Sequence, residues 1–251
     1  MVELETRNWR SLGNTRFSVT MALALVAAIM LPAVEKRGRA QSIGAACPKV
    51  AAIHQYLMPE DAEVALARSA APESISKDAD VLVLDRHGYR TAIKGRNGFV
   101  CAVQRSWTAG LDDPEFWNPQ LRAPICFNPP AARSYLPRIV KRTKLVLAGK
   151  TKEQLADEMK AAFEAKEIPR IESGTMGYML SRQCYLSDRD GHWHPHIMIF
   201  VSQADPVEWG ANLPGSPIFG SSDQTDRVSV FFIPVRKWSD GSSDSSHSGS
   251  R

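Results

Sequence analysis

The stretch "DVLVLDRHGYRTAIKGRNGFVCAVQR" (residues 80–105) holds three short runs that are rich in β-branched and aromatic side chains. Runs of this kind, separated by Gly- and Asn-containing segments, are typical of β-strands. We expect strands at 80–85, 89–94 and 99–105. Asn97-Gly98 favours a tight hairpin turn, because both residues tolerate a positive φ. The stretch therefore predicts a three-stranded antiparallel meander.

Helical patterns flank this block. "PEDAEVALARSAA" (59–71) has a proline at its first turn followed by acidic residues, and Pro72 ends it. "AARSYLPRIVKRTKLVLAG" (131–149) predicts a helix that Pro137 must break or kink and that Gly149 terminates. Both segments are expected to pack on the sheet.

A third helix is predicted over residues 152–167. Thr151 and Gln154 have the spacing of a capping box. Leu155, Met159 and Phe163 follow at intervals of four, which places them on one apolar stripe that should face the core.

A second run of strands is expected at 176–181, 195–202 and 227–235. Strands, then helices, then strands indicate the α+β class. About 200 residues can bury one sizeable core, so we expect one domain over 41–238, built as an antiparallel sheet with a few packed helices.

Both ends of the chain differ in composition from this domain. Residues 1–40 combine Arg7, Arg10 and Arg16 with an apolar core of 14 residues (21–34), shorter than the roughly 20 residues that span a bilayer. This layout predicts a cleaved signal peptide, and therefore a periplasmic or extracellular protein without a transmembrane span in the mature chain. Residues 239–251 are low in complexity and are expected to be a disordered tail.

Removal of the leader changes the charge balance. The leader contains six of the 31 Lys/Arg and three of the 27 Asp/Glu, which leaves 25 basic and 24 acidic residues in the mature chain. This near-neutral balance argues against nucleic acid as a partner. The basic segment "RIVKRTK" (138–144) is interpreted as the solvated face of a helix.

Four cysteines remain in the mature chain, namely Cys47, Cys101, Cys126 and Cys184, and no CxxC pair is present. An even number in an exported protein permits two disulfides. We expect Cys101 to pair with Cys126, because closing the irregular, Trp- and Pro-rich segment between them would stabilise the fold by roughly 3 kcal/mol. A Cys47–Cys184 bridge follows only by elimination.

The motif "DGHWHPHIMIFV" (190–201) places His192, His194 and His196 at alternate positions before an apolar run. In an extended chain, alternate side chains share one face. We therefore predict a metal site in which His194 and His196 are the first ligands and His192, Asp188 or Asp190 completes the set. Zinc with one open position is the first candidate metal. Copper is the second, with Met198 as a soft ligand.

Other interpretations of the same region stay open. The histidines could be structural, with His196 buried and His194 solvated. Cys184 and His194 could form a nucleophile pair across a hairpin. Ser181, His196 and Asp188 form a possible catalytic trio, although no GxSxG motif is present. The Trp-containing loops 112–120 and 208–219 could supply aromatic walls to a small-molecule pocket.

Several blocks of the chain together resemble a family of uncharacterised exported bacterial proteins. They are "NGFVCAVQRSW", "PICFNPPAARS", "GHWHPHIMIF" and "WGANLPGSP". The resemblance implies export and a single domain, and it implies no chemical activity. The leading hypothesis is therefore an exported protein with a histidine-based zinc or copper site, and hydrolysis is a reaction such a site would support. The alternative is a non-enzymatic periplasmic binding or envelope-associated protein with structural histidines, for which a small-molecule ligand is possible.

Overall fold

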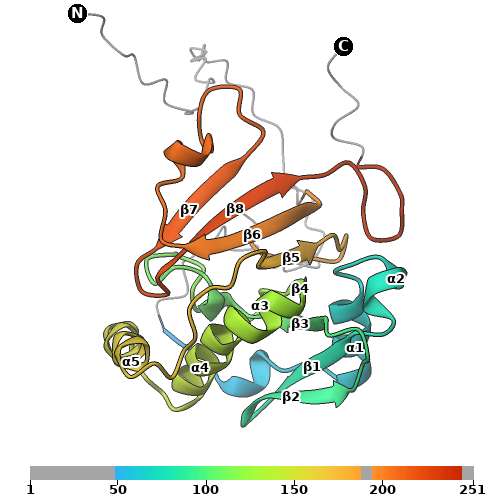
Figure 1. The fold of residues 1–251 in the computed structure, drawn as a ribbon. Helices are drawn as coiled ribbons and strands as arrows, with labels where there is room; N and C mark the ends of the chain where they lie inside the picture. Colours follow the sequence, from blue (N-terminus) through green and yellow to red (C-terminus); the bar gives the residue numbers. More distant parts are fainter. Residues whose placement is uncertain (1–48, 188–193, 245–251) are drawn as a thin grey trace, which may run out of the picture. The chain divides into compact units, whose positions relative to one another are not determined.

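A computed structural model describes residues 49–187 and 194–244. These residues form an α+β fold around an eight-stranded mixed sheet in the order β2-β1-β3-β4-β5-β6-β8-β7 (Figure 1). The strands are β1 (Asp80–Asp85), β2 (Gly88–Ile93), β3 (Val100–Gln104), β4 (Ala123–Phe127), β5 (Met176–Met179), β6 (His196–Ser202), β7 (Phe219–Asp223) and β8 (Val228–Pro234). The helices are α1 (Glu60–Arg68), α2 (Glu73–Ser76), α3 (Pro129–Ser134), α4 (Leu136–Leu147) and α5 (Lys152–Glu164), with 3-10 turns η1 (Ile53–Gln55), η2 (Ser106–Thr108) and η3 (Val207–Trp209).

The predicted meander is correct in its three strands and wrong in the pairing of the third. β1 and β2 form an antiparallel hairpin, but β3 lies on the other side of β1 and runs parallel to it. The connection 94–99 crosses the start of β1, where Asp78 O accepts hydrogen bonds from the amides of Arg96 and Asn97. A Cβ on Gly95 would lie 2.2 Å from Asp78 O, so the crossing needs glycine there. The sheet is therefore mixed, although every other pair of neighbouring strands is antiparallel.

Two strands were not expected from the sequence. β4 lies inside the segment interpreted as an irregular loop, and Pro124 within it lacks the amide that a strand residue normally donates. β7 has an exposed–intermediate pattern rather than a buried one, and it forms one edge of the sheet. β4 is an apolar run whose proline argued against a strand, whereas β7 has no apolar run at all.

The helix predictions are confirmed with small changes of boundary. The helix expected at 131–149 is broken at Tyr135 into α3 and α4, and Pro137 lies in the first turn of α4. The Thr151–Gln154 capping box is present at the start of α5. Leu155 and Met159 of the predicted stripe are fully buried.

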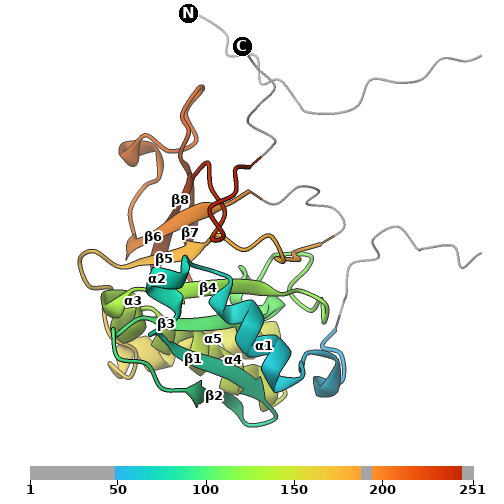
Figure 2. The same ribbon diagram turned by 90° about the vertical axis from the view of Figure 1, so that its right-hand side faces the viewer.

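The helices cover the two faces of the sheet unequally. On one face, α1 packs Leu66 and Ala67 against Val81 and Val103. On the other face, α3 and α4 pack Tyr135 and Ile139, among others, against strands β4 and β6. Figures 1 and 2 show α1 and α3 on opposite sides of the central strands, while β6, β7 and β8 extend beyond α3 and α4. One face of these last strands is thus left without a covering helix.

The described residues at the C-terminal end extend past residue 238. Residues 239–244, which the sequence assigned to the tail, make backbone contacts with the fold: the Ser239 amide donates to Leu180 O, and the Asp244 amide donates to Arg236 O. The predicted signal peptide and residues 245–251 lie outside the described residues. Within residues 49–187 and 194–244, no helix is long and apolar enough to cross a bilayer.

Candidate functional site

The two described histidines of the motif have different environments. His192 lies outside the described residues. His194 is partly exposed, and its Nδ1 lies 2.8 Å from Oδ2 of Asp244, whose side chain is 1% exposed. His196 begins β6 and is buried, with its Nδ1 2.9 Å from the carbonyl oxygen of His194. Both rings are therefore held through Nδ1 by an oxygen atom.

Burial gives His196 a different electrostatic character from a solvated imidazole. Desolvation lowers the pKa of His196, which favours its neutral form. In that form the proton bonded to the His194 carbonyl sits on Nδ1. No group of three or more His, Cys, Asp or Glu side chains suited to a metal ion occurs among the described residues. The other predicted ligands, Asp188 and Asp190, lie outside those residues.

The disulfide prediction is confirmed for Cys101 and Cys126. These residues are directly opposed on β3 and β4, their Cα atoms are 4.0 Å apart, and both are fully buried. Cys47 lies outside the described residues, so a Cys47–Cys184 bridge stays a prediction.

Ser181, the serine of the possible catalytic trio, is 1% exposed. Its hydroxyl is bonded to the Ser69 hydroxyl at 2.6 Å and accepts a hydrogen bond from the Gln183 amide. This serine therefore has the surroundings of a structural group.

A pocket of about 820 Å³ lies on the sheet face that α3 and α4 leave uncovered. Its floor is apolar and includes Met179, Met198, Val230 and Phe232. The strand register explains this floor, because Met198 is paired with Phe232 across β6 and β8, and paired residues point to the same face. Tyr135 from the α3–α4 junction closes one side.

Two polar segments form the walls of the pocket. The first wall follows β3 and spans residues 106–114; the second spans residues 221–226, at the end of β7 and the turn into β8. In the second wall, Asp223 Oδ1 accepts a hydrogen bond from the Asp226 amide, and this bond stabilises the turn. A volume of this size, with an apolar floor and polar edges, is typical of small-molecule sites.

Arg142 of α4 connects the two walls from below. Its side chain is 1% exposed; Nη1 donates to the carbonyl oxygens of Trp107 and Ala109 in the first wall. Its Nη2 lies 3.2 Å from Asp226 Oδ1 and 3.6 Å from Asp223 Oδ2 in the second wall. One guanidinium therefore fixes the separation of the walls.

The interpretation of residues 138–144 as a solvated helix face was wrong for its arginines. Arg138 and Arg142 are 2% and 1% exposed, respectively. They are four residues apart and so lie on the same helix face, which points to the protein. Arg138 Nε donates a hydrogen bond to the backbone oxygen of Asp226, so both arginines contact the β7–β8 turn.

Asp226 is the carboxylate most affected by this environment. Burial raises its pKa from 3.8 to about 6, an effect that the nearby Arg142 guanidinium opposes only in part. A group with a pKa near 6 changes its charge within the range of ordinary extracellular conditions. The charge of the second wall therefore depends on pH.

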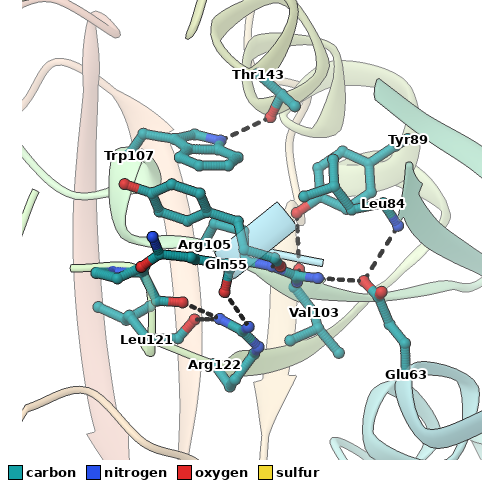
Figure 3. Close-up of polar contacts among 12 residues, drawn as sticks. Gln55, Glu63, Leu84, Tyr89, Val103, Arg105, Trp107, Leu121, Arg122 and Thr143 are labelled. Atoms are coloured by element: carbon teal, nitrogen blue, oxygen red, sulfur yellow. Dashed lines mark hydrogen bonds and ion pairs between the residues drawn. The ribbon is translucent and has the colours of Figure 1, made fainter. Parts of the chain in front are cut away.

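The first wall is anchored by a buried polar network (Figure 3). Arg105, the residue before the wall, and Glu63 of α1 are both fully buried and form an ion pair with an N–O distance of 2.8 Å. Glu63 also accepts a hydrogen bond from the Leu84 amide, and Arg105 donates a hydrogen bond to the Tyr56 carbonyl. Trp107 Nε1 donates to Thr143 Oγ1 on α4. These contacts tie the start of the wall to α1, β1 and α4.

The Trp-containing loops do not build aromatic walls. Phe116 and Trp117 are buried in the core, and only Asp112, Asp113 and Pro114 of segment 112–120 line the pocket. Trp209 is 52% exposed and stacks on Phe231, on the opposite face of β8 from Phe232. Sequence reasoning missed the pocket, because its floor looks like an ordinary strand core until the helices are placed.

No family model, no curated protein and no solved structure matches this chain. The resemblance to exported bacterial proteins therefore stays a prediction.

Proposed function

We propose that this protein is an exported, non-enzymatic binding protein that takes an amphipathic small molecule into the pocket between the two walls. The observation that carries the proposal is a pocket of about 820 Å³ with an apolar floor on an uncovered sheet face. Methionine and aromatic side chains at the bottom of a pocket are stabilised when a ligand displaces water from their accessible surface.

Export is part of the same proposal. A buried disulfide, as formed by Cys101 and Cys126, is typical of proteins that fold in an oxidising compartment. The predicted leader at residues 1–40 and the resemblance to exported proteins agree with this compartment. Mass spectrometry of protein recovered from the periplasm or medium should find a mature N-terminus near Gln41. Retention of residues 1–34 would contradict export.

The test of binding uses Nile red, a neutral dye whose fluorescence rises when it leaves water. Ser221 lies on β7, is exposed and lines the pocket, so Ser221→Trp should fill the site without disturbing the core. We expect it to weaken dye binding at least about tenfold, or ~1.4 kcal/mol. Thr91→Trp, at an exposed position of the edge strand β2, is the matched control and should bind as the wild type does. Equal binding by both variants would refute the pocket as the site.

A second candidate function is metal binding at His194 and His196, with zinc or copper as the metal and hydrolysis as the reaction an open zinc position would support. The observation that favours it is the pair of Nδ1 contacts, to Asp244 and to the His194 carbonyl. Metal-ligating histidines are oriented in this way through the nitrogen that does not bind the metal.

Metal analysis of untagged protein purified from the periplasm tests this second candidate. His194→Ala and His196→Ala should each abolish stoichiometric metal. His87→Ala, an exposed histidine in the β1–β2 turn, should retain it. Absence of stoichiometric metal from the wild-type protein would exclude the metal site and leave the pocket proposal untouched.

A further inference from the structure

The charges that line the pocket are predominantly negative. Four carboxylates line it: Asp112 and Asp113 in the first wall, and Asp223 and Asp226 in the second. Arg105 also lines it, but its guanidinium is neutralised by Glu63, and both side chains are fully buried. A ligand in this pocket therefore meets carboxylates from both walls and, among the lining residues that the structure describes, no uncompensated cation.

Arg142, Arg138 and Lys152, three of the described cations, approach the walls from outside the lining. Arg142 lies beneath both walls, and Arg138 donates to the Asp226 backbone while its guanidinium lies 5.2 Å from the Phe163 ring centroid. Lys152 donates to the Leu111 carbonyl, and its ammonium lies over the Phe116 ring. These contacts occupy the three cations with protein groups, and none of them lines the pocket.

Asp226 has an acceptor oxygen that the protein does not fully use. The residue is 5% exposed, and Oδ1 receives no hydrogen bond of acceptable geometry from the described residues, although Arg142 Nη2 lies 3.2 Å away. A buried carboxylate oxygen without a well-aligned donor is costly. A ligand donor or cationic group entering the pocket would reduce this cost.

We infer that the pocket selects a cationic amphiphile, with the apolar part of the ligand on Met198 and Phe232 and its ammonium group between the carboxylates of the two walls. This inference rests on the proposed binding function and names the class of ligand. The apolar floor explains affinity, and the carboxylates at the edges explain the preference for positive charge.

The pH dependence of binding follows from the same geometry. The groups that face Asp226 are Arg142, Arg138, Asp223 and Tyr135. Because the pKa of Asp226 lies at about 6, the second wall gains negative charge as the pH rises through that value. A cation should therefore bind more tightly at pH 7.5 than at pH 5.

The experiment compares three probes with the same alkyl chain: decylammonium, decyl sulfate and decyl maltoside, each below its micelle concentration. Displacement of Nile red from the full mature protein measures the affinity of each. We expect the cation to bind about tenfold more tightly than the anion, the effect of one or two charge-assisted contacts. Equal affinities, or a preference for decyl sulfate, would overturn this inference. The proposed binding function would still stand as long as Nile red binds.

Variants locate the preference. Asp112→Asn is at an exposed position and should fold normally, while Asp226→Asn removes the buried carboxylate. Each should reduce the affinity for the cation several-fold relative to that for decyl maltoside, by roughly the value of a partly screened charge pair. Asp157→Asn, on the exposed face of α5, is the matched control. Loss of cation preference in the control as well would refute the assignment to the walls. Failure of all probes including Nile red would refute the pocket function itself.

Discussion

Removing the Cys101–Cys126 disulfide should destabilise the protein by an amount that follows from the loop it closes. The two cysteines are 25 residues apart in the sequence. In the chain-entropy model, a cross-link that closes a loop of that length raises the free energy of unfolding by about 3.5 kcal/mol at 25 °C. For a domain of this size, such a loss lowers the midpoint of thermal unfolding by roughly 7–14 °C.

The double variant Cys101→Ala/Cys126→Ala is preferable to a reductant, because a reductant would also cleave the predicted Cys47–Cys184 bridge. Urea unfolding followed by circular dichroism measures both the stability and its dependence on denaturant, the m value. Without the cross-link the denatured chain is less compact, so m should increase as stability falls.

Val103→Ala is the matched control for the lost volume. Val103 lies two residues from Cys101 on the same strand, faces the same helix and is fully buried. Its truncation should cost about 2 kcal/mol through lost burial and a cavity, with m unchanged. A loss below about 1 kcal/mol in the double variant, or an m value equal to that of the wild type, would refute the loop-closure argument.

Three further predictions concern other parts of the fold. Thr151→Ala removes the capping box of α5 and should lower stability by about 1 kcal/mol in thermal unfolding; no change would show that the helix end is held by packing alone. Glu63→Gln leaves the Arg105 guanidinium buried without a counter-ion and should cost about 3–5 kcal/mol in urea unfolding, whereas the double change Glu63→Leu/Arg105→Met should cost less; a larger loss in the double variant would contradict this. Asp226 binds its proton more tightly in the folded state, because burial raises its pKa from 3.8 to about 6. Its contribution to stability is therefore fully present below about pH 4 and is lost as the pH rises through about 6, and Asp226→Asn should remove that part of the pH dependence; an unchanged profile would show that another group titrates.

Local features of the fold could be predicted because their causes lie within a few residues of each other. The capping box needs only Thr151 and Gln154, and the structure has both of its hydrogen bonds. Strands β1, β2 and β3 follow from apolar runs and Gly-containing turns, with boundaries within one residue of those expected. The Cys101–Cys126 pairing was also accessible, since composition alone marked the intervening segment as one that a cross-link would stabilise.

The site depends on arrangements that no local pattern specifies. Arg138 and Arg142 are charged, and charge in a helix normally indicates solvent; only the position of the β7–β8 turn makes their face the buried one. The parallel placement of β3 is set by the backbone crossing at Gly95, a contact between segments that the turn signal at Asn97-Gly98 cannot reveal.

The sequence by itself determined the α+β class, most helices and strands, the helix caps and one disulfide, because these depend on short-range propensity and apolar periodicity. Tertiary structure alone decided which sheet face stays uncovered. Met198 and Phe232 have the same alternating pattern as the core residues of neighbouring strands, and they line a pocket because α3 and α4 end before reaching them. The pocket lies where the helices leave the sheet uncovered. Which part they cover is decided by packing between elements that are distant in the chain.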